Sequence, residues 1–125
     1  NTGGYMELVP ITEEFYEFVR LLRNSQPGFL TLNVNITPDQ QVAYMDKNHT
    51  NYYIGLLYGE PVGFIGVMKD DIRLCTHPDA QGKGVGTFML EEIVKIYPNA
   101  TGRILKDNLP SQKAFEKAKV TYKLI

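Results

Sequence analysis

The sequence predicts an α/β fold with a mixed central sheet of about six strands and four helices. Two apolar runs, 52–58 and 62–68, are rich in β-forming residues and joined by a short turn, so they predict a hairpin. After residue 70, short strand patterns alternate with helical ones, which indicates helices that connect parallel strands. Since 125 residues is the size of one domain, we expect residues 1–125 to form a single domain with the element order βααβββαβαβ.

The first half of the chain predicts one strand and two helices ahead of the hairpin. Residues 5–9 alternate as a strand and end at a proline. A helix over 12–23 then begins with Thr12 as its N-cap, and its apolar residues recur at helical spacing. A second helix over 37–48 begins with a Thr-Pro-Asp-Gln sequence, which provides an N-cap, a first-turn proline and a capping-box glutamine. The signal over 29–36 is mixed.

The second half predicts alternating strands and helices. One strand ends before a His-Pro pair, and a glycine-rich segment follows it. Apolar residues at helical spacing then predict a long amphipathic helix that ends before a proline. The expected elements are strand 72–76, helix 85–97, strand 103–106, helix 109–119 and strand 121–125.

Composition and charge exclude several classes of function. Thirteen Lys and Arg side chains against fourteen Asp and Glu give a net charge of −1 without long runs of one sign, so we expect no nucleic-acid partner. The apolar stretches are too short to span a bilayer, so we expect no membrane partner. Two histidines and one cysteine without paired spacing predict no metal site.

The start of the chain and its cysteine content bear on location. Residues 1–5 carry no hydrophobic period, so we interpret them as an expression remnant or a disordered start, with Met6 as a candidate initiator. The single cysteine, Cys75, allows no internal disulfide. Together with the lack of a secretory leader pattern, this predicts a cytoplasmic protein.

The segment with the clearest chemistry is the glycine-rich stretch 77–86, His-Pro-Asp-Ala-Gln-Gly-Lys-Gly-Val-Gly. It lies between a predicted strand and a predicted helix, where glycines let the backbone approach a ligand and free N–H groups of the helix bind phosphate. Lys83 adds a positive charge. A Walker loop needs Ser or Thr after its lysine, but Gly84 follows here, and the dinucleotide fingerprint needs a different glycine spacing. A plain strand-to-helix turn is the alternative without function.

Residues 81–86, Gln-Gly-Lys-Gly-Val-Gly, match the pattern [QR]-x-x-G-x-[GA] and resemble the acyl-CoA loop of the GNAT superfamily, the Gcn5-related N-acetyltransferases. Residues 76–79 resemble that family's strand exit, and residues 59–65 resemble its turn into the third strand. Asn108 stands where the family's asparagine opens the helix after strand five, and 115–117, Phe-Glu-Lys, resembles its Tyr-Glu-Lys. The resemblance spans nearly the whole chain and is strongest from the third strand onward.

This resemblance implies an N-acetyltransferase that moves acetyl from acetyl-CoA to a primary amine of a small molecule or peptide by direct attack. Backbone N–H groups of the loop would hold the CoA pyrophosphate, and the exposed backbone of the preceding strand would hydrogen-bond the pantetheine. No metal takes part. The cofactor-binding residues that the resemblance implies are Leu74, Cys75, Thr76, Gln81, Gly82, Lys83, Gly84, Val85, Gly86, Thr87, Asn108 and Phe115.

The sequence offers few groups for acid and base catalysis. Asp70 stands where some family members have an acidic general base, although an Asp-Asp pair also suits a solvated turn between strands. Phe115 replaces the tyrosine whose hydroxyl, in many members, protonates the departing CoA thiolate. This loss motivates a second hypothesis, a catalytically weak or inactive CoA-binding regulatory module on the same fold. Cys75 and His77 share a strand face, but the strand pattern favours a buried cysteine over a nucleophile.

The acceptor is constrained by the segment between the first two helices, which in this family lies over the substrate cleft. Asp39 is the only charged residue from 24 to 45. We therefore expect a small amine or a neutral peptide end rather than a polycation. Four apolar residues of this segment suit either an apolar acceptor pocket or the core: Phe29, Leu30, Leu32 and Val34.

The end of the chain departs from the family pattern. Residues 119–120, Lys-Val, stand where the family commonly has Gly-Phe. The expected strands also stop at six, where the family has a seventh. A sheet edge without its usual neighbour leaves backbone groups unpaired, so either a second copy of the chain supplies a strand in a homodimer or the fold is simply minimal.

Overall fold

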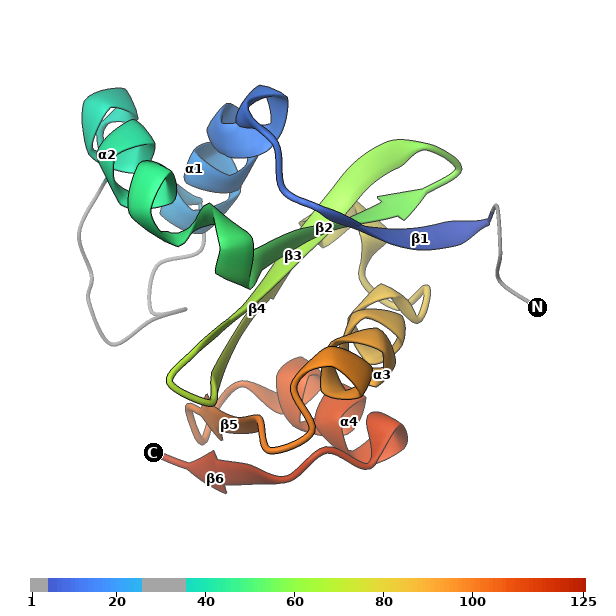
Figure 1. Cartoon of the computed structure of the whole chain (residues 1–125). Helices are drawn as coiled ribbons and strands as arrows, with labels where there is room; N and C mark the ends of the chain where they lie inside the picture. The colour runs from blue at the N-terminus through green and yellow to red at the C-terminus, as the bar shows by residue number, and fades with distance from the viewer. Residues whose placement is uncertain (1–4, 26–35) are drawn as a thin grey trace.

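The computed structural model describes residues 5–25 and 36–125, so the segment 29–34, which suits either an acceptor pocket or the core, lies outside the described residues. In the described part, a six-stranded sheet runs through the centre of the molecule in the order β1-β2-β3-β4-β5-β6 (Figure 1). Strands β1 to β4 are antiparallel, and β5 and β6 join them in parallel. The strands are β1 (Met6–Pro10), β2 (Tyr52–Leu57), β3 (Glu60–Met68), β4 (Asp71–Thr76), β5 (Thr101–Ile104) and β6 (Tyr122–Leu124).

Two pairs of helices cover this sheet. Helices α1 and α2 lie on one face, and α3 and α4 lie on the other (Figure 1). The α/β class, the mixed sheet and the order βααβββαβαβ that the sequence predicts are confirmed. The helices of the described residues are α1 (Tyr16–Asn24), α2 (Pro38–Asn48), α3 (Val85–Ile96) and α4 (Leu109–Ala118), with short 3-10 turns at Glu13–Phe15, His49–Asn51 and Pro78–Ala80.

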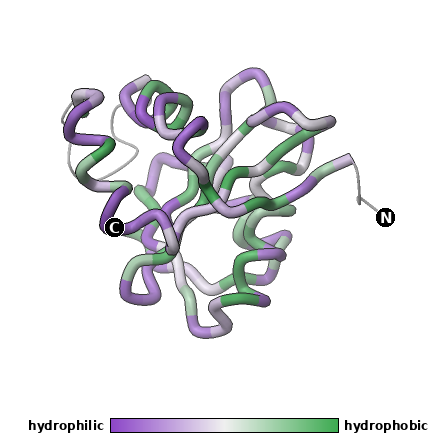
Figure 2. The backbone as a smooth tube through the Cα atoms, turned by 45° about the horizontal axis from the view of Figure 1, so that its top comes forward, coloured by the Kyte–Doolittle hydropathy of each residue, from purple (hydrophilic) through white to green (hydrophobic). Residues whose placement is uncertain are grey.

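Alternating side chains of the central strands fill two hydrophobic clusters, one beneath each pair of helices. On the α3 side, Ile65 and Leu74 pack in one cluster with Met89. On the α1 side, Ile54 packs in a second cluster with Leu22. Figure 2 shows the apolar residues concentrated in the strands and on the helix faces that meet them. Because both faces are covered, β4 is held firmly from both sides of the sheet.

Most element boundaries agree with the sequence prediction to within two residues, and two of the differences have a clear structural cause. Thr12 does not cap a helix, because its hydroxyl donates to the Glu14 carboxylate at 3.1 Å and a 3-10 turn precedes α1. The strand expected over 103–106 begins two residues earlier. The N–H of Thr101 donates to the carbonyl of Asp70 at 2.8 Å, and this bond draws the start of β5 to the start of β4.

The sheet opens between β4 and β5. These strands pair only at Asp71 with Thr101 and at Ile72 with Gly102. On its other side β4 stays paired with β3 as far as Thr76. The part of β4 beyond Ile72 therefore has a free edge toward β5, and a gap separates the two strands there.

Strands β1 and β6 form the two edges of the described sheet. An edge strand presents unpaired backbone groups, which is consistent with strand addition by a second chain. The homodimer stays a prediction, and a monomer mass by light scattering would contradict it. None of the described helices has the length and apolar character that a membrane crossing requires.

Helix α4 ends in a left-handed residue that is not glycine. Lys119 has a φ of 60°, and its N–H donates to the carbonyl of Glu116 while the N–H of Val120 donates to that of Phe115. These two bonds form a Schellman motif, whose left-handed position is usually glycine. The position at which the sequence departs from the family's glycine is thus one where glycine is favoured.

We expect Lys119→Gly to stabilise the protein by about 0.5–1 kcal/mol, because glycine adopts the left-handed conformation without strain. Thermal unfolding should show a rise of a few degrees in Tm. The matched control is Lys47→Gly on α2, where the helical conformation makes glycine destabilising by about 1 kcal/mol. A lower Tm for Lys119→Gly would contradict the assignment of strain to this residue.

Candidate functional site

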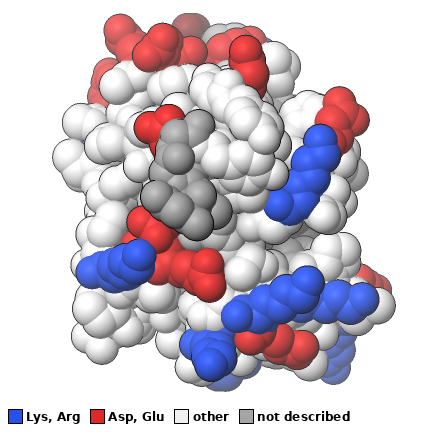
Figure 3. All heavy atoms as spheres, turned by 90° about the vertical axis from the view of Figure 1, so that its right-hand side faces the viewer, with Lys and Arg blue, Asp and Glu red and all other residues white. Residues whose placement is uncertain are grey.

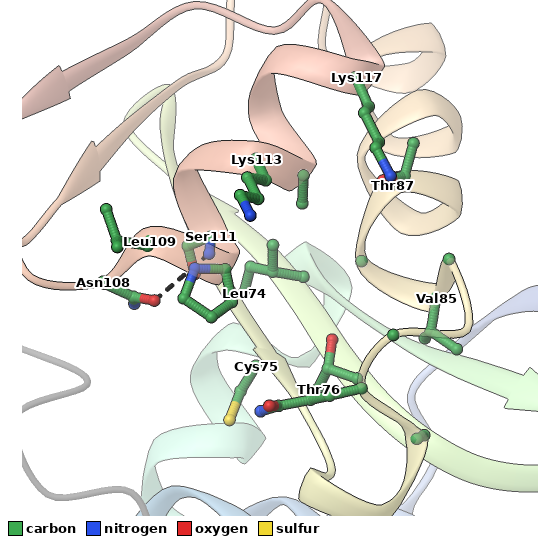
Figure 4. Close-up of a pocket in the computed structure, with 17 residues that line it drawn as sticks. Leu74, Cys75, Thr76, Val85, Thr87, Asn108, Leu109, Ser111, Lys113 and Lys117 are labelled. Atoms are coloured by element: carbon green, nitrogen blue, oxygen red, sulfur yellow. Dashed lines mark hydrogen bonds between the residues drawn. The ribbon is translucent and has the colours of Figure 1, made fainter.

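A cavity of about 460 Å³ occupies the gap at the free edge of β4. Its walls come from β4, from the glycine-rich loop with the start of α3, and from the start of α4 (Figure 4). The lining residues are Leu74, Cys75, Thr76, Ala80, Gln81, Gly82, Gly84, Val85, Gly86, Thr87, Asn108, Leu109, Pro110, Ser111, Lys113, Ala114 and Lys117.

The β4 wall is a strand edge. Leu74, Cys75 and Thr76 are consecutive and point alternately to the two faces of the sheet, yet all three line the cavity. The cavity therefore runs along the edge of β4, where alternate N–H and C=O groups have no neighbouring strand. An extended ligand with amide groups can bond to this edge as an added strand would.

The opposite wall is the N-terminus of α3. Gly84 precedes the helix with a φ of 83°, and no side chain caps this end. The first N–H groups of a helix have no acceptor within it, and the helix dipole adds positive potential there. The first turn of α3 also contains no acidic residue. This end of the cavity is therefore suited to a phosphate or pyrophosphate group.

Helix α4 adds a basic wall that the sequence analysis missed. Lys113 and Lys117 line the cavity from one face of α4, and Figure 4 shows Lys117 extending toward Thr87 on α3. In the view of Figure 3, most of the lysine and arginine side chains lie in the half of the molecule that holds α3 and α4, with acidic side chains among them. The sequence signal for this wall was the spacing of three and four residues between Pro110, Lys113 and Lys117, because that spacing places them on one face of a helix.

Asn108 holds this wall in place. Its side-chain oxygen accepts a hydrogen bond from the N–H of Ser111 at 3.3 Å, which caps the start of α4 beside the cavity (Figure 4). The asparagine therefore fixes the direction of the helix that carries Lys113 and Lys117.

Two of the expected cofactor-binding residues, Lys83 and Phe115, are not among the cavity-lining residues. Lys83 is exposed in the loop. The Phe115 ring is buried with 2% of its surface exposed, and it packs over Gly102 and against the Tyr122 ring at 5.7 Å. Tyr122 does not replace the missing hydroxyl at the cavity, because it donates to Glu116 at 2.6 Å. The same hydrogen bond raises the pKa of Tyr122.

Asp70, the expected general base, lies apart from the cavity. It is exposed in the turn between β3 and β4, in the left-handed conformation with a φ of 64°. Four residues of extended strand, about 13 Å, separate it from Leu74. Its neighbour Asp71 begins β4 and is half-buried.

Neither Cys75 nor His77 is suited to act as a nucleophile or a base. Burial raises the pKa of the Cys75 thiol to about 12, so the thiolate is scarce at neutral pH. The His77 ring accepts the N–H of Asp79 on Nδ1 at 3.1 Å, which gives it a role in shaping the loop. Within the described residues, no three His, Cys, Asp or Glu side chains lie together as metal ligands.

Comparison with known families agrees with this geometry. A family profile described as the acetyltransferase (GNAT) family matches residues 12–119, which include every wall of the cavity. The chain belongs to the GNAT family. No curated protein sequence matches it closely enough to add to this assignment.

Solved structures show that the fold is the GNAT fold. An N-acetyltransferase from Staphylococcus aureus Mu50 is 16% identical, with a TM-score of 0.77 over 91% of this chain and 82% of that one. The protein yncA from Salmonella typhimurium, solved with its cofactor acetyl-CoA, is 13% identical, with a TM-score of 0.75 over 90% and 77%. The aminoglycoside N-acetyltransferase AAC(6')-Iy in complex with CoA is 16% identical, with a TM-score of 0.69 over 97% and 92%.

Proposed function

We propose that this GNAT protein transfers an acetyl group from acetyl-CoA to a primary amine of a small molecule or peptide. The observation that carries the proposal is the cavity between the free edge of β4 and the uncapped start of α3. The first wall suits the amides of pantetheine and the second suits the pyrophosphate. Structural relatives solved with acetyl-CoA or CoA support the donor. Their low identity supports no particular acceptor.

In this proposal the lysines of α4 contact the donor electrostatically. CoA carries several phosphate charges, and Lys113 and Lys117 line the same cavity as the start of α3. Two positive charges beside the helix N-terminus favour an anion there.

The transfer step follows from direct attack. The amine nitrogen forms a bond to the acetyl carbon, the carbon–sulfur bond breaks, the nitrogen loses one proton and the CoA thiolate gains one. Holding both reactants in the gap makes the reaction effectively intramolecular. Phe115 has no proton to give, and the Cys75 thiol is buried. The thiolate is a good leaving group, so water is a sufficient proton source.

We expect Phe115→Tyr to lower stability without raising turnover. The ring is buried over Gly102 and does not line the cavity, so an added hydroxyl would lie in the core. Burying a hydroxyl without a partner costs about 1–3 kcal/mol. Thermal unfolding and kcat with one active amine check both parts. Faster turnover would show that the ring reaches the sulfur and that a missing acid limits this protein.

We expect Asp70→Asn to leave kcat/KM within about threefold of the wild-type value, because Asp70 lies about 13 Å along the strand from Leu74, the first residue of β4 that lines the cavity. Asparagine also tolerates the left-handed conformation of this turn, so the fold should persist. A pH profile of kcat/KM for both proteins checks this. Loss of about a hundredfold, together with loss of a titration on the acid side, would restore Asp70 as the general base.

In a second candidate function, the protein binds CoA in the same cavity but does not catalyse acetyl transfer. Its motive is that Phe115 is buried outside the cavity, so this position offers no side-chain proton to the departing thiolate, as a CoA-binding regulatory module would not need one. The discriminating experiment is release of CoA thiol from acetyl-CoA with a broad panel of primary amines. The one protein thiol, Cys75, is buried and adds little background. Amine-dependent release supports the enzyme, whereas tight binding without turnover supports the module.

The cytoplasm remains our proposed location for this protein, and the proposal rests on the cysteine content alone.

A further inference from the structure

An arginine and tyrosine cluster lies on the sheet face opposite the α3 and α4 helices. Arg73 of β4 is half-buried and shares a strand face with Cys75, which packs in the cluster beneath α1 and α2. An Arg73 Nη donates to the hydroxyl of Tyr44 on α2 at 3.3 Å. That hydroxyl is hydrogen-bonded to the Tyr52 hydroxyl at 2.7 Å.

A second arginine, Arg23 at the end of α1, lies close enough to Arg73 for their charges to interact. Burial lowers the pKa of Arg23. The positive charge of Arg73 also lowers it, whereas the interactions with Tyr52 and Tyr44 raise it. Neither guanidinium forms an ion pair with a carboxylate of the described residues. Residues 26–35 contain no acid in their sequence.

A third arginine stands across the gap. Asp71 pairs with Thr101 in a parallel register, so Arg103 of β5 projects to the same face as Arg73, one strand away. Arg103 is exposed and likewise forms no ion pair within the described part of the chain. On this face, therefore, one arginine flanks the gap from each strand.

The acid near this cluster is Asp71. It shares the face of Arg73, and its charge interacts with that of Arg73, but the two do not form an ion pair in the structure. Its Oδ1 atom is buried without a hydrogen-bond partner. Among the described residues, Arg23 interacts with Arg73, Arg103 projects to the same sheet face from β5, and Asp71 is the acid whose charge reaches Arg73, so the charge that these groups bring to this face is positive.

The position of this mouth makes it the entrance for the acceptor, if the proposed function holds. The donor cavity is walled by α3 and α4 on one face of the sheet, so on the proposed function the acceptor has to approach the free edge of β4 from the side that the donor does not occupy, where Arg73 and Arg103 project. The half-buried guanidinium of Arg73 has no carboxylate partner among the described residues and so favours an anion, and the planar donor sets of both arginines suit a carboxylate.

We propose that the acceptor is an amine that also carries a carboxylate, such as an α-amino acid, and that Arg73 and Arg103 bind this carboxylate at the mouth of the gap. The inference rests on the proposed function and names the class of its acceptor. It narrows the expectation of a small amine or a neutral peptide end, drawn from residues 24–45, to a small amine with a carboxylate, because the basic residues come from β4, β5 and the end of α1. The site disfavours a polycation for the same reason.

The test compares pairs of acceptors that differ only in the carboxylate. L-leucine is paired with 3-methylbutylamine, and L-phenylalanine with phenethylamine, and CoA release gives kcat/KM for each. We expect a preference of about tenfold or more for the amino acid of at least one pair. In Arg73→Gln and Arg103→Gln this preference should fall through a higher KM for the amino acid. In both variants, kcat/KM for the plain amine should stay within about twofold of the wild-type value. In the control Lys47→Gln, kcat/KM for the amino acid and for the plain amine should both stay within that range.

A binding measurement separates failure of this inference from failure of the proposed function. Calorimetry compares N-acetyl-L-leucine and N-acetyl-L-phenylalanine with N-(3-methylbutyl)acetamide and N-phenethylacetamide, which lack the carboxylate, with and without CoA. Binding that needs the carboxylate and is lost in Arg73→Gln supports the inference even without turnover. Plain amines that react as well as amino acids would overturn it and leave the acetyltransferase intact. Without turnover, the absence of carboxylate-dependent binding would overturn it as well.

Discussion

Gly86→Leu is expected to weaken acetyl-CoA binding by more than about a hundredfold, a loss of about 2.7 kcal/mol, while the protein stays folded. A Cβ atom at Gly86 would lie 3.5 Å from Ala114 and 3.6 Å from the Thr76 hydroxyl, which are ordinary contacts. A longer side chain has to extend into the cavity that these residues line. Calorimetry with acetyl-CoA measures the change.

The matched control is Gly86→Ala. Its methyl group fits without moving its neighbours, and alanine favours the helix, so the Tm should be unchanged or higher. Binding should weaken by only a few-fold. Gly84 is a poorer choice because its φ of 83° makes any side chain strained. A folded Gly86→Leu protein that binds acetyl-CoA as tightly as the wild type would place the donor elsewhere.

The second large effect is electrostatic. We expect the double variant Lys113→Glu with Lys117→Glu to raise the dissociation constant for acetyl-CoA about ten- to a hundredfold at low salt. The two side chains line the cavity, and reversing their charge makes them repel the CoA phosphates. Salt screens such interactions, so the difference from the wild type should shrink at about 0.5 M salt.

A control double variant separates local from overall charge. Lys47 and Lys123 are exposed on α2 and β6 and do not line the cavity. Changing both to Glu alters the net charge equally and should change the dissociation constant less than about threefold. Equal effects of the two double variants, or no effect of the first at low salt, would contradict a role for α4 in donor binding.

Local signals predicted most of the fold. The capping box at Thr37 is present, with the Thr37 hydroxyl accepting the Gln40 N–H at 3.2 Å and the Gln40 side chain accepting the Thr37 N–H at 2.9 Å. The hydrophobic periods that predicted the other strands and helices also depend only on residues that are close in the sequence. The start of β5 was not predicted in this way, because it depends on the bond between Thr101 and Asp70, which lie 31 positions apart in the sequence.

The candidate site also has parts that local sequence patterns predicted and parts that they did not. The glycine-rich loop and the end of β4 are continuous in sequence, so one pattern was enough to predict their place at a cavity. The α4 wall requires knowing that this helix returns beside α3. The motif also located Phe115 on α4 without revealing that its ring packs over Gly102. The arginines at the mouth of the gap depend on the register of β4 and β5, which no local pattern encodes.

The most direct test of the acyl-CoA cavity is calorimetric titration of the purified protein with acetyl-CoA, CoA and NADH. The cavity at the free edge of β4 and the start of α3 predicts binding of both CoA species at micromolar concentration or tighter, without measurable binding of NADH. Failure of acetyl-CoA and CoA to bind would contradict it. The glycine-rich loop would then be a turn between β4 and α3 without a ligand.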